Sequence, residues 1–262
     1  MSETQIHPSS VVEEGAQIGQ GCQIGPFCHI GAQVRLGDGV ELKSHVAIAG
    51  DTSVGAGTTI WPFASLGHRP QDLKFAGEAS TLEIGERNMI REYVTMNPGT
   101  EGGGLRTQVG SDSLFMMGVH VGHDCRVGDR VVCANYANLG GHCSIGDDVV
   151  IGALAGIHQF CRVGDGAMIG GLSAVVADVV PYGTVTGERA TLAGLNLVGL
   201  KRRGVDKAQI NEMRAAFSDL FEGENSLKSN AEALVSRYPN NPFVLSMAEF
   251  LQADTQRRFT RP

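Results

Sequence analysis

The sequence predicts an all-β fold class, a parallel β-helix, followed by a small α-helical domain. Aliphatic residues recur every six positions through most of the chain, which is typical of a solenoid of short strands. The 36 glycines among 262 residues suit many regularly spaced tight bends. After about Val185 the six-residue period gives way to helical spacing. We therefore expect a β-helix over residues 1–187 and a helical domain over residues 188–262.

A six-residue period fits neither an amphipathic helix nor a hairpin meander. It fits short strands that each point one side chain inward before a bend. Three such strands make one triangular coil, so each inward residue lies over its counterpart 18 positions earlier. The inward positions are Val12, Ile18, Ile24, Ile30, Leu36, Leu42, Ile48, Val54, Ile60, Leu66, Ile84, Ile90, Met96, Val109, Phe115, Val121, Val127, Cys133, Leu139, Ile145, Ile151, Ile157, Val163, Ile169 and Val175.

Two stretches, residues 67–83 and 97–108, interrupt this period. Insertions that leave a solenoid and return to its rhythm predict functional loops. In the C-terminal part, the apolar residues from Ile210 to Phe221 fall on one helical face. Further helices are expected near residues 226–237 and 241–253, so that a small helical domain closes the solenoid.

Charge and composition exclude several classes of partner. The formal net charge of −7 argues against nucleic acid and against an anionic membrane surface. No long apolar run predicts a membrane span, and the first residues do not resemble a signal peptide. The six cysteines contain no C-x-x-C pair, so reduced thiols and a cytoplasmic location are expected.

Histidines gather on one edge of the predicted β-helix. The inward positions Val121, Leu139 and Ile157 share one face because they are 18 residues apart. Four of the eight histidines lie beside these positions: His120, His123, His142 and His158. A single histidine at a corner would more simply be bonded to backbone, but four stacked together predict a site. One interpretation is a zinc site of the γ-class carbonic anhydrase kind, with His120, His123 and His142 as ligands.

The other interpretation is the transfer of an acyl group to a hydroxyl. A histidine can take the hydroxyl proton near neutral pH. A backbone N–H at a glycine can stabilise the oxyanion that forms, and Gly140 and Gly141 directly precede His142. No nucleophile elbow is recognisable, so the hydroxyl would attack directly.

Four motifs carry a family resemblance: His120-Val121-Gly122-His123-Asp124-Cys125, QDLKFAGE at residues 71–78, Ile157-His158-Gln159-Phe160, and NLVGLKRRG at residues 196–204. They resemble the signatures of the UDP-N-acetylglucosamine O-acyltransferases, a hexapeptide-repeat family, and the resemblance covers the whole chain. It implies a left-handed parallel β-helix and a homotrimer without a cofactor. It also implies transfer of a 3-hydroxyacyl chain from acyl carrier protein to the 3-OH of UDP-N-acetylglucosamine, the first step of lipid A biosynthesis.

The resemblance assigns roles motif by motif. His123 would be the general base and Gly141 the oxyanion donor. Asp124 would orient His123, although neighbouring strand residues normally point to opposite faces. The expected substrate contacts are Asp72, Lys74, His120 and His142 for the sugar and pantetheine ends, His158, Gln159, Asn196, Arg202 and Arg203 for the nucleotide, and Gly171 for the length of the acyl chain.

Two positions depart from the family pattern. Asn97 stands where a histidine is common, and Val198 stands where an acidic residue is common. Asn97 offers both a donor and an acceptor, so the 3-amino analogue of the sugar nucleotide remains an alternative substrate. The related N-acyltransferase of the same pathway is a further alternative, but it carries an extra N-terminal domain. A non-enzymatic binding scaffold is the last alternative, against which the histidine edge argues.

Overall fold

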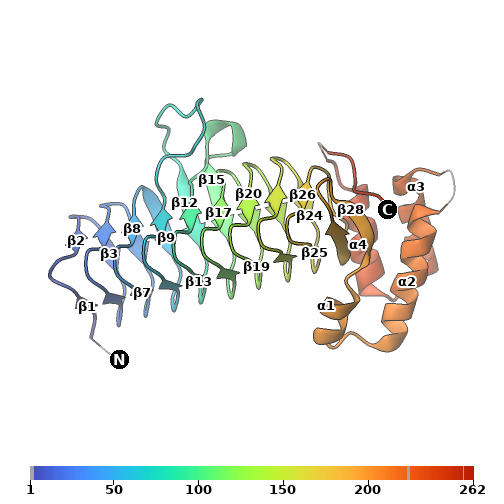
Figure 1. The fold of residues 1–262 in the computed structure, drawn as a ribbon, viewed down its shortest axis with the longest axis horizontal. Helices are drawn as coiled ribbons and strands as arrows, with labels where there is room; N and C mark the ends of the chain where they lie inside the picture. Colours follow the sequence, from blue (N-terminus) through green and yellow to red (C-terminus); the bar gives the residue numbers. More distant parts are fainter. Residues whose placement is uncertain (1–2, 223–224, 256) are drawn as a thin grey trace.

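The structure, a computed structural model, describes residues 3–222, 225–255 and 257–262. It is an elongated parallel β-helix with the N-terminus at one end and a group of helices at the other (Figure 1). From β1 to β23, each strand pairs in parallel with the strand three further along the chain, which produces three long sheets. The predicted solenoid of six-residue repeats is therefore confirmed.

The strands form three faces of the β-helix. The first sheet contains β1 (Gln5–Ile6), β4 (Gln23–Ile24), β7 (Glu41–Leu42), β10 (Thr59–Ile60), β13 (Met89–Ile90), β16 (Leu114–Phe115), β19 (Val132–Cys133), β22 (Val150–Ile151), β25 (Met168–Ile169), β27 (Gly183–Thr186) and β28 (Thr191–Leu195). The second contains β2 (Val11–Val12), β5 (His29–Ile30), β8 (Ala47–Ile48), β11 (Ser65–Leu66), β14 (Thr95–Met96), β17 (His120–Val121), β20 (Asn138–Leu139), β23 (Gly156–Ile157) and β26 (Ala174–Val175). The third contains β3 (Gln17–Ile18), β6 (Arg35–Leu36), β9 (Asp51–Val54), β12 (Thr81–Ile84), β15 (Arg106–Val109), β18 (Arg126–Val127), β21 (Ser144–Ile145) and β24 (Arg162–Val163).

The core is a column of stacked aliphatic side chains. Ile145 pairs with Val127 on one side and with Val163 on the other, at the predicted spacing of 18 residues. All three side chains are almost fully buried. Burying one such side chain stabilises a fold by roughly 1.5–3 kcal/mol, so the repeated column is the main source of stability.

Each coil turns at three corners, and the third residue of most turns adopts the left-handed backbone conformation. Tyr136, His142 and Asp148 show this in one coil, with φ values of 58°, 61° and 57°. We name the corners after them. The aromatic corner joins the first and second sheets, the histidine corner joins the second and third, and the charged corner joins the third and first. The backbone strain of these left-handed residues is offset by hydrogen bonds between the turns of neighbouring coils. One such bond runs from the His142 N–H to the His123 carbonyl at 2.9 Å.

The two predicted loops lie at the histidine corner and protrude from the same side of the β-helix (Figure 1). The first covers residues 67–80, because β12 already begins at Thr81 to pair with β9 and β15. The second covers residues 97–105 and contains the short 3-10 helix η1 (Glu101–Gly103). Both therefore end earlier than the sequence predicts.

The C-terminal part contains α1 (Leu197–Arg202), α2 (Lys207–Phe221), α3 (Leu227–Arg237) and α4 (Pro242–Gln252). The expected apolar face of α2 is confirmed at Ile210, Met213 and Leu220, which are buried. Two features were not expected: α1, and the antiparallel pairing of β27 with β28. The domain boundary at residues 187/188 stays a prediction, and it lies in the turn between these two strands.

The segment after α4 returns to the β-helix and is fastened there by Asp178, which is fully buried. The Asp178 carboxylate accepts hydrogen bonds from Nε of Arg162 at 2.7 Å and from the Thr255 hydroxyl at 2.5 Å. The Arg162 guanidinium also lies over the rings of Phe250 and Phe259. This arrangement brings the C-terminal segment close to the histidine corner.

The six cysteines are all buried and unpaired, as the sequence predicts. Within the described part of the chain, each helix is too short or too polar to cross a membrane.

Candidate active site

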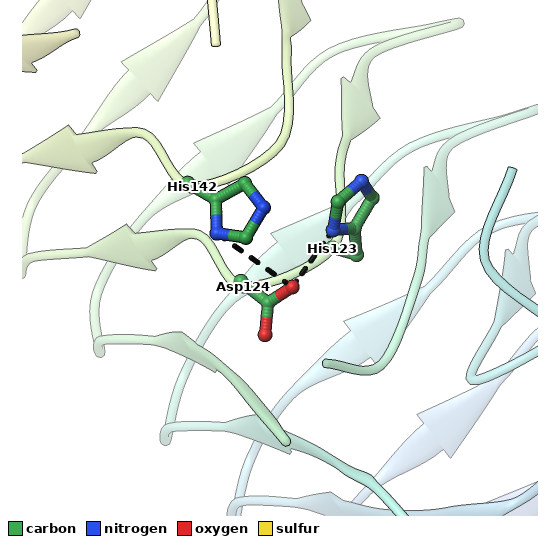
Figure 2. A group of neighbouring side chains, drawn as sticks. All are labelled: His123, Asp124 and His142. Carbon is green, nitrogen blue, oxygen red and sulfur yellow. Dashed lines mark hydrogen bonds and ion pairs between the residues drawn. The ribbon is translucent and has the colours of Figure 1, made fainter. Parts of the chain in front are cut away.

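His123 and Asp124 lie in the turn that follows β17, and His142 lies in the turn that follows β20. Nδ1 of His123 is 2.7 Å from Oδ2 of Asp124 (Figure 2). The alternation of strand side chains had argued against this contact. That argument was wrong because β17 ends at Val121, and Asp124 has a φ of 59°. The left-handed turn points both side chains to the same place.

The Asp124 side chain is buried and surrounded by hydrogen-bond donors. Its Oδ2 accepts the Thr100 hydroxyl at 2.6 Å, and its Oδ1 accepts the Thr100 N–H at 2.9 Å. An ionised carboxylate is an acceptor only, so Nδ1 of His123 is the donor in their contact. Nε2 of His123 then carries the free lone pair that a general base needs.

His142 packs beside His123. The two rings meet edge to face with centroids 4.9 Å apart, and His142 also stacks on Phe160 with centroids 4.3 Å apart. Burial lowers the pKa of His142 below its usual 6.5, and the nearby charge of Asp124 only partly opposes this. His142 is therefore an uncharged hydrogen-bonding group at neutral pH.

Gly141 lies directly against the His123 ring. A β-carbon at this position would be 2.6 Å from Nε2, so the backbone can approach only because the residue is glycine. No acceptor in the described part of the chain takes the Gly141 N–H. At the equivalent turn position of the charged corner, the Asp147 N–H is satisfied by Oδ1 of Asp165. The histidine corner thus leaves a backbone donor free beside His123.

Two further predicted residues, His120 and Asp72, lie near His123 and His142. His120 is on β17, with Nδ1 2.8 Å from the Thr95 hydroxyl, and burial lowers its pKa, helped by the charge of His123. Asp72 in the first loop is close enough for its charge to raise the pKa of His142 in the same chain. Lys74 is exposed in that loop, and its N–H bonds to Oδ1 of Asp72 at 2.9 Å.

His158 and Gln159 follow β23, one coil beyond His142. Arg257 from the C-terminal segment donates to Nδ1 of His158 at 2.9 Å and to the Gln159 carbonyl at 3.0 Å. The sequence did not predict Arg257. In the sequence, Arg257 stands out only as part of a short basic run near the end of the chain. This run lies outside the six-residue repeat, so the repeat could not place Arg257 on the β-helix.

The comparisons with known proteins support one family over the whole chain. The sequence profile described as "Udp N-acetylglucosamine O-acyltransferase; Domain 2" matches residues 178–260. The bacterial transferase hexapeptide profile matches residues 15–50 and 142–177. The chain is 54% identical to an acyl-[acyl-carrier-protein]--UDP-N-acetylglucosamine O-acyltransferase of Paracoccus denitrificans, over 100% of this chain and 99% of that protein. The chain belongs to the UDP-N-acetylglucosamine O-acyltransferase family.

Solved structures of this family share the fold. The crystal structure of the protein from Acinetobacter baumannii has a TM-score of 0.95 at 37% identity and covers 98% of this chain and 99% of that one. The protein from Campylobacter jejuni has a TM-score of 0.93 at 37% identity and covers 98% and 100%. The predicted fold class, a β-helix of hexapeptide repeats with a C-terminal helical domain, is confirmed.

Within one chain of this family member, the predicted nucleotide contacts do not all lie beside His123. Asn196 caps α1 through Oδ1, and its Nδ2 donates to the Gly166 carbonyl at 3.0 Å. Arg203 covers Gly166 and is 3.9 Å from Asp148 at the charged corner. Arg202 is exposed in the last turn of α1. These three residues therefore lie near the charged corner, away from the histidines.

Gly171 lies at yet another corner. It precedes Leu172, which has the left-handed conformation of the aromatic corner and is largely exposed. A β-carbon on Gly171 would lie 3.2 Å from the Ala153 carbonyl oxygen and otherwise point into open space. A single chain thus places the histidines, the α1 pair Asn196 and Arg203, and Gly171 on three different edges.

The two departures from the family pattern are structurally distinct. Asn97 is buried, and its Nδ2 donates to the carbonyls of His68 and Arg69 at 3.1 and 3.4 Å. Its donor side is therefore already occupied, contrary to the expectation that it offers both a donor and an acceptor; its Oδ1 has no partner. Val198 is exposed on α1.

The zinc interpretation required His120, His123 and His142 to meet. In residues 3–222, 225–255 and 257–262, the one cluster with three candidate ligand atoms within 4.8 Å of one another is His123, Asp124 and His142. His120 is not in that cluster, so the predicted three-histidine set is not assembled. Nδ1 of His123 and Oδ2 of Asp124 are also committed to each other.

Proposed function

We propose that the chain transfers a 3-hydroxyacyl group from acyl carrier protein to the 3-OH of UDP-N-acetylglucosamine, as the first step of lipid A biosynthesis in the cytoplasm. The observation that carries this proposal is the free Nε2 of His123 beside the free N–H of Gly141. Together they provide a base and an oxyanion donor at one point. The relatives' printed names supply the two substrates.

The reaction is a single displacement. Nε2 of His123 takes the proton from the sugar hydroxyl while the hydroxyl oxygen attacks the thioester carbonyl carbon. The tetrahedral oxyanion is stabilised by the Gly141 N–H, and the ionised Asp124 stabilises the imidazolium. Collapse of the intermediate breaks the carbon–sulfur bond, and the imidazolium returns its proton to the leaving thiolate. The products are the sugar ester and the free carrier thiol, and no cofactor takes part.

The separation of the predicted residues on three edges supports a homotrimer with its active sites between chains. Asn196, Arg202 and Arg203 of one copy would complete the nucleotide site at the histidine corner of the next. Arginine pairs suit a diphosphate because their guanidinium groups bind oxygens in a bidentate way.

Exposed apolar side chains support the same assembly. The aromatic corner presents a row of exposed residues: Phe27, Phe63, Tyr93, Tyr136, Leu154 and Leu172. Beside it, the outward positions of the first sheet from β13 to β25 are Met89, Leu114, Val132, Val150 and Met168. Exposed apolar side chains gathered along one corner are typical of a face that packs against another chain. Leu73 is fully exposed in the first loop and would pack against the neighbouring copy in the same way.

A basic groove supports binding of an acidic carrier protein. It has a volume of about 600 Å³ and lies between β28, the start of α3 and the C-terminal segment. Among the residues that the structure describes, its lining contains no carboxylate and five cations: Arg189, Lys228, Arg257, Arg258 and Arg261. None of these has an ion-pair partner among the described residues, although the chain has a net charge of −7. Because Arg257 contacts His158, the groove adjoins the histidine corner.

The assay that tests this function offers a 3-hydroxyacyl carrier-protein thioester with UDP-N-acetylglucosamine or with its 3-amino analogue. We expect kcat/KM to favour the hydroxyl acceptor and mass spectrometry to detect the ester as the main product. A strong preference for the amine would show that the 3-amino analogue, and not UDP-N-acetylglucosamine, is the acceptor. Stoichiometric zinc together with carbon dioxide hydration activity would instead support the carbonic anhydrase alternative.

A further inference from the structure

The second loop folds onto the Asp124 carboxylate. Thr100 is the residue in contact, and only 4% of it is exposed. Its N–H and its hydroxyl bind the two oxygens of the carboxylate, at 2.9 Å to Oδ1 and 2.6 Å to Oδ2. Oδ2 is thus shared between the Thr100 hydroxyl and Nδ1 of His123.

The loop backbone is shaped for this contact. A β-carbon on Gly103 would lie 2.0 Å from Cγ of Asp124, so only glycine lets the loop close over the carboxylate. Gly104 and Leu105 then turn the chain with φ values of 95° and 64°. The Leu105 N–H bonds back to the Thr100 carbonyl at 2.9 Å, which closes the loop on Thr100 itself.

The two donors of Thr100 prevent the carboxylate from rotating. A rotated carboxylate would lose one or both bonds, and a buried charged group without its donors costs free energy. With the carboxylate held, one lone pair of Oδ2 faces the Thr100 hydroxyl and another faces Nδ1 of His123. That geometry favours the tautomer with the proton on Nδ1 and the free lone pair on Nε2.

We propose that Thr100 is a positioning residue for the transfer reaction: it holds Asp124 so that His123 keeps its basic Nε2 towards the substrate. This inference rests on the proposed function for its kinetic consequence. The tautomer of His123 is a property of the free protein and can be measured without any substrate.

The test compares Thr100→Val, which loses only the hydroxyl donor, with Thr100→Ser, which keeps it. We expect kcat/KM to fall roughly tenfold to a hundredfold in T100V, as for loss of one hydrogen bond to a charged group. Because the carboxylate is then free to rotate away from Nδ1 of His123, it stabilises the imidazolium less, so the acidic limb of the kcat/KM profile should move to lower pH. T100S should restore both quantities.

Thr58→Val is the matched control. Thr58 is also fully buried, and its hydroxyl bonds to the Gly85 carbonyl, far from the histidine corner. Its loss should lower thermal stability without moving the pH profile. An equal shift of the pH profile in T58V, or a wild-type profile in folded T100V, would overturn the proposal.

Gly103→Ala gives a second route, because the added methyl group pushes the loop off Asp124 while Thr100 is retained. We expect the same shift in pH profile as in T100V, and a wild-type profile would count against the proposal. Nitrogen NMR of the His123 ring in the unliganded protein should show the Nδ1–H tautomer in wild type and T100S, and a mixture in T100V. If wild type shows that tautomer but does not acylate UDP-N-acetylglucosamine, the proposed function fails while the positioning role stands.

Discussion

A β-carbon on Gly141 would lie 2.6 Å from Nε2 of His123, so the backbone of one coil touches the imidazole of the coil before it. This contact places the free N–H of Gly141 beside His123, the proposed general base. Any side chain at residue 141 must therefore displace the His123 ring.

Gly141→Ala should lower kcat by about a hundredfold or more, because it moves both the base and the oxyanion donor. Gly31→Ala is the control: it lies in a turn of the same corner, and its β-carbon would make only ordinary contacts, the nearest at 3.4 Å from Cα of Ala49. Steady-state kinetics with both substrates should leave G31A at the wild-type rate. A fully active G141A would exclude the proposed oxyanion site.

Gly171→Met tests the assignment of acyl-chain length. The residue is exposed and has an ordinary backbone conformation, so the methionine side chain extends outward from the aromatic corner. If the acyl groove passes this corner between two copies, the added volume should shift the preference to shorter 3-hydroxyacyl chains. Competition between donors of different length measures the shift. Leu172→Met, one residue later, hardly changes the side-chain volume and should keep the wild-type preference for acyl-chain length. If G171M also kept that preference, another residue would limit the length of the acyl chain.

The basic groove predicts a defect that depends on the carrier protein. Reversing the charge of Arg258 and Arg261 together should raise KM for the acyl carrier-protein thioester roughly tenfold or more, with little change for an acyl-pantetheine thioester. Arg214→Glu on α2 is the control, since Arg214 is exposed and does not line the groove. An equal increase in KM for the carrier-protein thioester and for the pantetheine thioester would show that the groove binds the acyl-pantetheine part and not the carrier protein.

Two half-buried histidines, His120 and His142, predict how stability depends on pH. Burial lowers the pKa of His120 and His142 below 6.5, so the unfolded chain binds their protons at a higher pH than the folded chain does. Their contribution to stability is complete above pH 6.5 and is lost as the pH falls through that value towards the lowered pKa values. The Tm should therefore fall between pH 7.5 and pH 5, and His142→Gln should show a smaller fall. An identical pH dependence in H142Q would contradict this origin.

The sequence period predicts most of the fold because it is a direct consequence of strand geometry. Val127, Ile145 and Val163 stack because 18 residues make one coil, and the loops are visible as breaks in that count. The same count brings His123 and His142 together. Neither α1 nor the pairing of β27 with β28 belongs to the repeat, so the count could not place them.

The details of the site depend on features that carry no period. The contact between Asp124 and His123 arises from a left-handed turn, which strand alternation cannot predict. Thr100 reaches Asp124 from a loop, and Arg257 reaches His158 from the C-terminal segment. The distance between His123 and the predicted nucleotide residues on α1 follows from which corner each occupies.

The most direct test of the account is the rate of sugar ester formation by His123→Ala, measured with a 3-hydroxyacyl carrier-protein thioester and UDP-N-acetylglucosamine. Removal of a general base typically costs about 10²–10⁴-fold in rate. We predict a loss of that size in kcat, with an unchanged oligomeric state and Tm close to the wild-type value. Turnover near the wild-type rate in folded H123A would contradict the assignment of His123 as the base.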